Sequence, residues 1–316
     1  MKMLNKKNII VTGGAGFIGS NLCRELLKSS DNFVIAIDNL YSGKHENIVE
    51  LLDNENFRFI EHDVITPLVF SDKIDEIYHL ACPASPPFYQ KSPIAVSQTC
   101  FNGSLNMLEL ARTNNAKILL SSTSEVYGEP LEHPQKESYR GNVNPIGIRS
   151  CYDEGKRIAE SLFFDYHRQF DTKIKVVRIF NTYGPFMRGD DGRVVTNFIY
   201  QALNNQDITI FGDGTQTRSF CFVDDLVQAL LKMMQSPDDF TGPVNLGNPH
   251  EVNMLDIAEL IIQLTGSSSK LIFKPLPSDD PTRRKPDISL AESRLAWHPT
   301  TELTEGIQKT INFFKK

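Results

Sequence analysis

Short runs of apolar residues alternate with amphipathic stretches along roughly the first 180 residues of the chain. This alternation predicts strand–helix–strand units, and most of the apolar runs lack polar positions, which is typical of strands covered on both faces. The sequence therefore predicts the α/β class with a doubly wound parallel sheet. The predicted strands are 8–13, 33–38, 57–63, 76–81, 117–123 and 174–180, and the predicted helices are roughly 17–29, 94–114 and 149–169.

The pattern changes after about residue 182, where glycine and proline become frequent and short motifs such as YGP, FGDG and NLGNP appear. We interpret this part as a smaller C-terminal lobe that is partly interleaved with the sheet domain. The predicted division assigns 1–182 plus about 219–248 to the sheet domain, and about 183–218 plus 249–316 to the smaller lobe.

Composition narrows the class of protein. The chain has 316 residues, of which 40% are hydrophobic and 23% charged, as is ordinary for a soluble globular enzyme. The net charge of −6 argues against a general nucleic-acid surface, and no apolar run approaches the roughly 20 residues that span a bilayer. The five cysteines are scattered and lack CxxC spacing, so we expect a reducing, cytoplasmic setting and no metal site.

A glycine-rich turn follows the first predicted strand, in the stretch VTGGAGFIGSNL. Gly13 permits the tight turn, Gly16 lets the backbone approach a pyrophosphate, and Gly19 lets the following helix pack close to the sheet. Asp38 ends the second predicted strand, where its carboxylate can accept hydrogen bonds from ribose hydroxyls and would repel a 2′-phosphate. The pattern predicts a Rossmann-type site for NAD rather than NADP; the alternative is an ordinary strand–turn–helix in which Asp38 is a surface cap.

A tyrosine and a lysine lie four residues apart in SCYDEGKR, at Tyr152 and Lys156. On a helix these positions share a face, so the ammonium should favour the phenolate and lower the tyrosine pKa from about 10 toward neutrality. The phenolate could then act as a general base on a substrate hydroxyl. The strand end SSTSEVYG supplies the accompanying hydroxyl at Thr123 or Ser124. The alternative is a surface Tyr and Lys on an ordinary helix.

Several longer motifs carry a resemblance that extends over nearly the whole chain. They are GGAGFIGS (13–20), HLACPASPP (79–87), STSEVYGEP (122–130), NPIGIRSCYDEGKR (144–157), RIFNTYGP (178–185), DGRVVTNFI (191–199), GDGTQTRSF (212–220), VNLGNP (244–249) and RRKPDI (283–288). With these motifs the chain resembles the extended short-chain dehydrogenases/reductases that modify nucleotide sugars, and among them the UDP-glucuronate decarboxylases, or UDP-xylose synthases.

The resemblance implies that NAD-dependent decarboxylation converts UDP-glucuronate to UDP-xylose through a 4-keto intermediate, with NAD regenerated in the cycle. It also implies a tightly held NAD, a UDP-sugar substrate and a homodimer. The net charge and the lack of a long apolar run predict no nucleic-acid or membrane partner. Thr123, Tyr152 and Lys156 match the family's hydroxyl, base and pKa-setting lysine. Glu125 matches a second acid/base residue, and Arg284 matches the arginine that meets the sugar carboxylate region.

The remaining predicted contacts fall into two sets. The predicted cofactor-binding residues are Gly13, Gly16, Phe17, Ile18, Gly19, Asp38, Asn39, Ser42, Gly43, Asp63, Val64, Leu80, Ala81, Thr99, Tyr152, Lys156, Thr182 and Arg193. The predicted substrate-binding residues are Pro83, Ser85, Glu125, Tyr152, Asn181, Asn197, Phe211, Arg218 and Arg284. At Phe211 many relatives carry tyrosine, so stacking on uracil would survive there but a hydroxyl hydrogen bond would be lost.

Two related reactions remain as alternatives, a 4-epimerase and a 4,6-dehydratase acting on another nucleotide sugar. Dehydratases of the family carry Asp-Glu where this chain has Ser124-Glu125, and they need the aspartic acid to protonate a leaving C6 hydroxyl. Epimerases of the family usually lack the RKPD element found here at 284–287. Helices 94–114 and 149–169 match those that form a four-helix dimer bundle in the family, although an apolar stripe could equally pack against the sheet.

Overall fold

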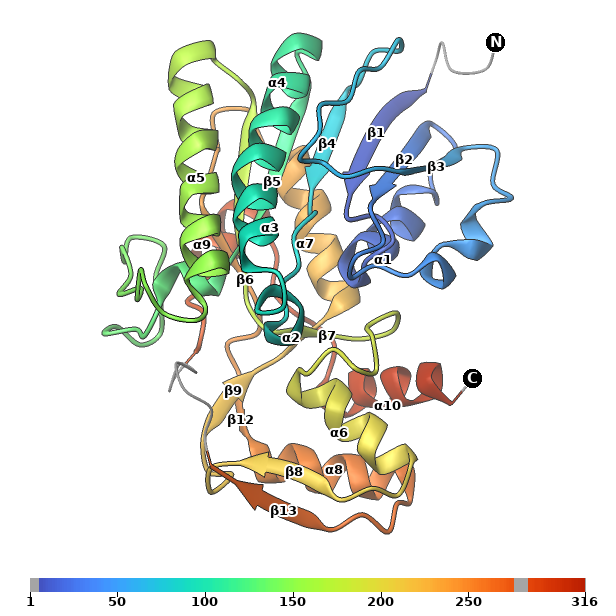
Figure 1. Ribbon diagram of the computed structural model, residues 1–316, viewed down its shortest axis with the longest axis vertical. Helices are drawn as coiled ribbons and strands as arrows, with labels where there is room; N and C mark the ends of the chain where they lie inside the picture. The colour runs from blue at the N-terminus through green and yellow to red at the C-terminus, as the bar shows by residue number, and fades with distance from the viewer. Residues whose placement is uncertain (1–5, 276–283, 316) are drawn as a thin grey trace.

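A seven-stranded parallel sheet forms the centre of the larger lobe in the computed structural model, which describes residues 6–275 and 284–315 (Figure 1). The strand order is β11-β6-β5-β4-β1-β2-β3, so the direction of winding reverses between β1 and β4. In such sheets ligands bind outside the carboxyl ends of the strands at this reversal. The strands are β1 (Lys7–Thr12), β2 (Asn32–Asp38), β3 (Phe57–Glu61), β4 (Glu76–His79), β5 (Lys117–Thr123), β6 (Ile174–Ile179) and β11 (Val244–Leu246).

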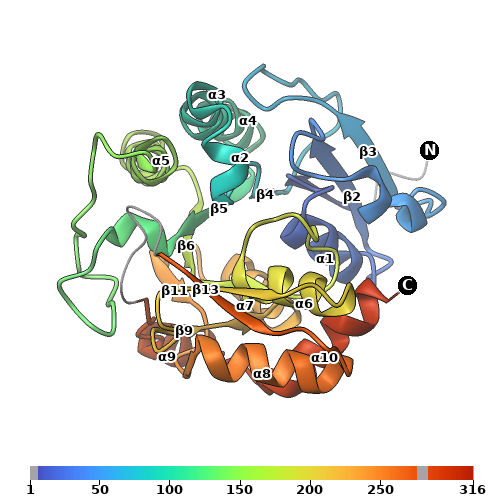
Figure 2. The same ribbon diagram turned by 60° about the horizontal axis from the view of Figure 1, so that its bottom comes forward.

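Helices cover both faces of this sheet (Figure 2). Successive residues of a strand point to opposite faces, and in β1 Ile9 and Val11 join one buried cluster while Ile10 joins another. The first cluster lies under α1 (Phe17–Leu26) and α7 (Val223–Gln235), and the second under α4 (Ser104–Asn114) and α5 (Ser150–Phe170). The six predicted strands and the doubly wound parallel fold are therefore confirmed.

The predicted helix over 94–114 is present, and it contains a π-helical turn that the sequence pattern did not reveal. It consists of α3 (Pro93–Gln98), a π-helical turn (Thr99–Gly103) and α4. The turn carries Cys100 against Gly155 of α5, where an added β-carbon would lie 2.9 Å from the cysteine sulfur. The two helices approach closely at this point because residue 155 has no side chain.

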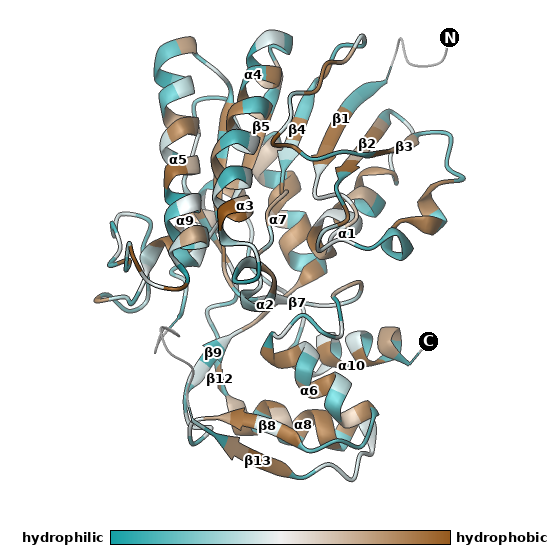
Figure 3. Ribbon diagram, viewed as in Figure 1, coloured by the Kyte–Doolittle hydropathy of each residue, from teal (hydrophilic) through white to brown (hydrophobic). Residues whose placement is uncertain are grey.

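The smaller lobe is built mainly from residues that follow β6. Figure 3 shows hydrophobic and hydrophilic residues mixed along its helices, as expected of helices that bury one face. Its strands pair as β8 (Ile208–Phe211) with β13 (Leu271–Lys274), β9 (Thr217–Ser219) with β12 (Glu251–Asn253), and β7 (Thr182–Tyr183) with β10 (Cys221–Phe222). The principal helices of the smaller lobe are α6 (Val194–Leu203), α8 (Met254–Thr265) and α10 (Leu303–Phe314). Elsewhere in the described chain, short helices occur at α2 (Pro86–Tyr89), His45–Asn47, Val49–Leu51, Ser124–Tyr127 and α9 (Ser289–Leu295).

The chain crosses between the lobes more than once. After β10 it returns to the large sheet through α7 and β11, and it then re-enters the smaller lobe at β12. The motif RRKPDI lies where the chain comes back toward the large sheet; its first residue, Arg283, is outside the described residues, whereas Arg284 is described. Within 6–275 and 284–315, no helix is long and apolar enough to cross a bilayer.

Candidate active site

A cavity of about 690 Å³ opens along the carboxyl ends of the central strands and reaches into the smaller lobe. It extends from the glycine-rich turn, past β5 and α5, to residues of β8 and β9. Every predicted cofactor-binding, substrate-binding and catalytic residue lines this cavity except Gly43. Gly43 instead packs beside Asp38, where an added β-carbon would lie 2.8 Å from a carboxylate oxygen. The structure therefore places the predicted residues, which come from distant segments of the chain, around one cavity.

The glycine-rich turn leaves a space that would be filled if its glycines carried side chains. Gly13 has a positive φ of +69°, and a β-carbon on Gly19 would lie 2.1 Å from the Gly13 carbonyl oxygen. The helix α1 begins directly after Gly16, so its first N–H groups open onto the cavity and can bind an anion. These features fit the pyrophosphate of a dinucleotide.

Asp38 supplies a buried carboxylate next to this turn. One oxygen accepts the N–H of Ala15 at 3.0 Å and the other accepts the N–H of Leu40 at 2.8 Å. Burial raises the pKa of Asp38, and these backbone N–H groups oppose the shift. The position and the acceptor capacity fit the ribose of an NAD adenosine.

We expect Gly19→Ala to lower the free energy of unfolding by about 3 kcal/mol, because the new methyl group would meet backbone atoms that cannot move aside. NAD retained on purification should also fall. Gly266→Ala is the control, since nothing lies within 4 Å of its added β-carbon and only its positive φ opposes the change, at a cost of about 1 kcal/mol. Urea denaturation compares the two; equal losses of stability would show that the Gly13–Gly19 contact is not tight.

Tyr152 and Lys156 lie one turn apart on α5, facing the end of β5. Lys156 Nζ donates to the Ser121 carbonyl oxygen at 2.8 Å, and it lies 6.0 Å from the centre of the Tyr152 ring. Thr123 caps the short helix Ser124–Tyr127, and its hydroxyl oxygen accepts the N–H of Glu125 at 3.2 Å. The predicted hydroxyl, phenol and ammonium are thus all at one wall of the cavity.

The expected lowering of the tyrosine pKa by Lys156 is not found. Burial raises the pKa of Tyr152 well above its ordinary value, Cys82 adds to the shift, and the Thr123 side chain opposes it. Lys156 donates a hydrogen bond to a backbone carbonyl oxygen, and burial is the largest cause of the raised pKa of Tyr152. The sequence placed the two residues correctly on one helix face but could not show how deeply the phenol is buried.

Glu125 lies between two arginines at the same wall. Arg284 is 2% exposed; it donates to the Ser124 carbonyl oxygen at 2.8 Å and approaches a Glu125 carboxylate oxygen at 3.2 Å. Arg149 donates to the same oxygen of Glu125. Burial alone would raise the pKa of Glu125, but the two guanidinium groups outweigh burial and hold that pKa below its usual range. The carboxylate is therefore ionised and oriented.

Sequence reasoning missed Arg149 and Tyr89. Arg149 precedes Tyr152 by three residues, so helical spacing could have suggested it. Arg149 also lies 3.9 Å from Asp153, whose pKa rises to about 7 through burial and the nearby Glu125 charge. Tyr89 comes from α2, and its ring stacks on Tyr152 with the centroids 5.4 Å apart and the planes 1° apart. Nothing in the local sequence indicated that contact.

Two buried hydroxyls at the cavity have no hydrogen-bond partner in the part of the chain that the structure describes. They belong to Ser85 and Tyr89, both of which line the cavity. Leaving such a hydroxyl unpaired costs about 1–3 kcal/mol, so these two positions are energetically unfavourable in the absence of a polar partner.

The end of β6 and the smaller lobe contribute the remaining predicted contacts. Asn181 follows β6 and Asn197 lies on α6, while Phe211 ends β8 with its ring exposed. Arg193 pairs with Asp191, and Arg218 donates to the backbone carbonyl of Thr217 at 2.9 Å. All of these residues line the same cavity as the glycine-rich turn.

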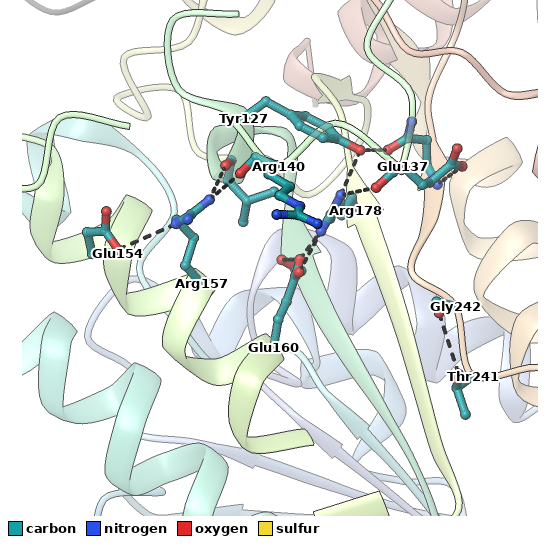
Figure 4. Close-up of polar contacts among 12 residues, drawn as sticks. Tyr127, Glu137, Arg140, Glu154, Arg157, Glu160, Arg178, Thr241 and Gly242 are labelled. Atoms are coloured by element: carbon teal, nitrogen blue, oxygen red, sulfur yellow. Dashed lines mark hydrogen bonds and ion pairs between the residues drawn. The ribbon is translucent and has the colours of Figure 1, made fainter. Parts of the chain in front are cut away.

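A buried polar network fixes α5 on the sheet behind the catalytic residues (Figure 4). Glu160 lies one turn beyond Lys156; it accepts the Ser122 hydroxyl at 2.6 Å and two guanidinium N–H groups of Arg178, at 2.8 and 3.0 Å. Arg178 also donates to the Tyr127 hydroxyl oxygen at 3.0 Å. Because Ser122 precedes Thr123 in β5, this network sets the register of Lys156 against the strand that carries the catalytic hydroxyl.

We expect Glu160→Gln to lower the free energy of unfolding by about 2 kcal/mol, because Arg178 would lose a bidentate charged partner in a mostly buried position. The matched control is Glu154→Gln on the same helix, whose carboxylate pairs with Arg157 at 3.5 Å and is 40% exposed. That change should cost less than about 0.5 kcal/mol. Urea denaturation midpoints measure both; a Glu160→Gln midpoint equal to wild type would exclude a stabilising role for the network.

Comparison with known proteins adds independent information. Residues 9–247 match the model of the NAD dependent epimerase/dehydratase family. The chain is 52% identical over 307 residues to UDP-glucuronic acid decarboxylase 1 of Arabidopsis thaliana, covering 97% of this chain and 69% of the relative. It is 49% identical over 312 residues to UDP-glucuronic acid decarboxylase 1 of Xenopus tropicalis, covering 99% of this chain and 73% of the relative.

The fold is also similar to that of a solved enzyme, UDP-glucuronic acid 4-epimerase from Bacillus cereus in complex with UDP-glucuronic acid and NAD. The TM-score is 0.85 at 30% sequence identity, over 98% of this chain and 99% of the other.

Proposed function

Because the chain belongs to the NAD-dependent epimerase/dehydratase family, we propose that it uses NAD to decarboxylate UDP-glucuronate to UDP-xylose, regenerating NAD in each cycle. The relatives that match over nearly the whole chain at about 50% identity are UDP-glucuronic acid decarboxylases. The observation that carries the proposal is the ionised Glu125 held between Arg149 and Arg284, at the wall that also presents Tyr152.

Tyr152 is the proton-transfer residue of the proposed reaction. NAD, when bound, would supply a hydride acceptor for C4 of the sugar and, as NADH, the hydride that returns to C4, and the positive charge of NAD would favour the phenolate of Tyr152. Tyr152 takes the proton of the C4 hydroxyl and returns it at the end of the cycle. Thr123 donates a hydrogen bond to the same oxygen, and Lys156 holds the base against β5 through the Ser121 carbonyl.

Decarboxylation needs little beyond the C4 ketone, because a carboxylate on C5 is then a β-keto acid. Charge left by the departing CO₂ flows onto the C4 oxygen, where Tyr152, now protonated, and Thr123 stabilise it by hydrogen bonds. The substrate carboxylate enters beside Glu125, which raises the Glu125 pKa by like-charge repulsion. Glu125 can then take up a proton and deliver it to C5, while Arg284 orients the carboxylate region.

The test is to incubate the purified protein with UDP-glucuronate and no added reductant. We expect CO₂ release and a pentose product, identified as UDP-xylose by mass and by chromatography. UDP-glucose, which lacks the carboxylate, is the control and should release no CO₂. A product of unchanged mass would instead indicate 4-epimerisation, the alternative favoured by the structural similarity to a UDP-glucuronic acid 4-epimerase. A keto product from another nucleotide hexose would indicate dehydration.

We further propose how the lobes and the subunits are arranged. Residues 1–182 plus about 219–248 would bind NAD, and about 183–218 plus 249–316 would bind the nucleotide sugar.

The helices α3 and α5 and the π-helical turn expose the apolar side chains of Ile94, Ile158 and Phe101, which supports a homodimer formed through these helices. Sedimentation of wild type and of an Ile94→Asp, Ile158→Asp variant tests the dimer.

We also propose a cytoplasmic location, which the five free cysteines support, because thiols stay reduced in that compartment.

A further inference from the structure

Two cysteines from separate segments meet beside the catalytic wall. Cys82 follows β4 and lines the cavity, whereas Cys100 belongs to the π-helical turn and is 3% exposed. Their sulfur atoms are 3.3 Å apart. Both pack in one apolar cluster with Tyr89 and Tyr152.

The two thiols differ in character. The hydrogen bond with Cys100 lowers the pKa of Cys82, and the nearby Lys156 ammonium acts in the same direction. The same hydrogen bond and burial raise the pKa of Cys100. Burial raises the pKa of Cys23 to about 12 and also raises those of Cys151 and Cys221. Since the thiolate is the nucleophile, Cys82 is the most reactive of the five.

We propose that Cys82 and Cys100 form a redox pair that hydroperoxides convert to a disulfide, and that this modification reversibly inactivates the adjacent catalytic site. The Cys82 thiolate attacks one oxygen of the hydroperoxide, the O–O bond breaks, and Cys82 becomes a sulfenic acid. The other oxygen leaves and is protonated to an alcohol or to water. The Cys100 thiol then attacks the Cys82 sulfur, forming the S–S bond and releasing water. Two thiols lose two electrons and two protons in total, and one hydroperoxide is reduced.

Disulfide formation would displace segments that the active site uses. A disulfide bond is about 2.05 Å long, so the sulfur atoms must approach by roughly 1 Å. Cys82 follows Ala81, whose N–H donates to Thr12 Oγ1 at 3.1 Å, and Cys100 follows Thr99; both neighbours line the cavity. A displacement of about 1 Å can lower a rate on the order of 100-fold.

The test treats the purified holoenzyme with hydrogen peroxide, alkylates the remaining thiols and digests the denatured protein with trypsin. Cleavage after Lys73, Lys91 and Arg112 places the two cysteines in different peptides, 74–91 and 92–112. We expect these peptides to be disulfide-linked. Turnover should fall in proportion to the linked fraction, and fully linked enzyme should be at least about tenfold slower than untreated enzyme. Dithiothreitol should reverse both changes.

Two variants separate this pair from other thiol oxidation. Cys100→Ser should abolish the linked peptides and leave Cys82 as a sulfenic acid that dimedone traps. Cys151→Ser, which removes a neighbouring thiol, should retain the linkage. The wild-type peptide measurement needs neither variant, so a misfolded variant does not remove the test. Alkylation of both Cys82 and Cys100 after peroxide treatment, or full linkage with unchanged turnover, would overturn the proposal. The linkage readout does not depend on which nucleotide sugar is the substrate.

Discussion

Replacing Tyr152 by phenylalanine is expected to lower the turnover of UDP-glucuronate by on the order of 10³-fold or more. The change removes the oxygen that we propose exchanges a proton with the C4 hydroxyl, and it keeps the aromatic ring. The parallel stack on Tyr89 should therefore persist, and with it the packing of this wall. Turnover is measured as UDP-xylose formed, and binding of UDP-glucuronate is measured separately by calorimetry.

The control for Tyr152→Phe is Tyr89→Phe, which removes the neighbouring hydroxyl of the stacked pair. It should weaken substrate binding more than it slows chemistry, because Tyr89 lines the cavity but its hydroxyl is not the proposed proton acceptor. A Tyr152→Phe enzyme that retains turnover within tenfold of wild type would contradict the assignment of Tyr152 as the base. Loss of nucleotide-sugar binding in the same variant would instead indicate that the wall had collapsed.

Features that depend on a few neighbouring residues could be predicted from the sequence. Gly13, Gly16 and Gly19 lie within seven residues, between the end of β1 and the first turn of α1, so their spacing alone predicts the strand–turn–helix geometry that the structure shows. Tyr152 and Lys156 follow from helical periodicity in the same way. The strands were predictable because burial on both faces removes nearly all polar positions from them.

Features that depend on contacts between distant segments could not be predicted in this way. The stack of Tyr89 on Tyr152 joins α2 to α5, and the contact of Cys82 with Cys100 joins the end of β4 to the π-helical turn. The raised pKa of Tyr152 has the same origin, because the neighbours that bury it come from several segments. The predicted helix over 94–114 is present, but the π-helical turn inside it could not be foreseen, because it leaves the apolar pattern nearly unchanged.

Arg284 shows how a distant residue completes the catalytic wall, and its replacement is expected to have the second large effect. Arg284→Ala should lower the rate of decarboxylation by on the order of 10²–10³-fold. The change removes the donor to the Ser124 carbonyl oxygen. It also removes one of the two guanidinium groups that contact Glu125, so that only Arg149 remains. Affinity for UDP alone should change little, because the contacts of Arg284 are at the catalytic wall.

Lys285→Ala is the matched control for Arg284→Ala, since it neutralises the adjacent residue. Lys285 pairs at 3.4 Å with Glu251, and its side chain is 31% exposed, so turnover should remain within about threefold of wild type. Combining Arg284→Ala with Glu125→Gln then tests whether the pair acts together. If Arg284 works by orienting Glu125, the double variant should be little slower than the slower single variant. Multiplicative losses would show that Arg284 meets the substrate carboxylate independently of Glu125, and unchanged turnover in Arg284→Ala would remove it from the mechanism.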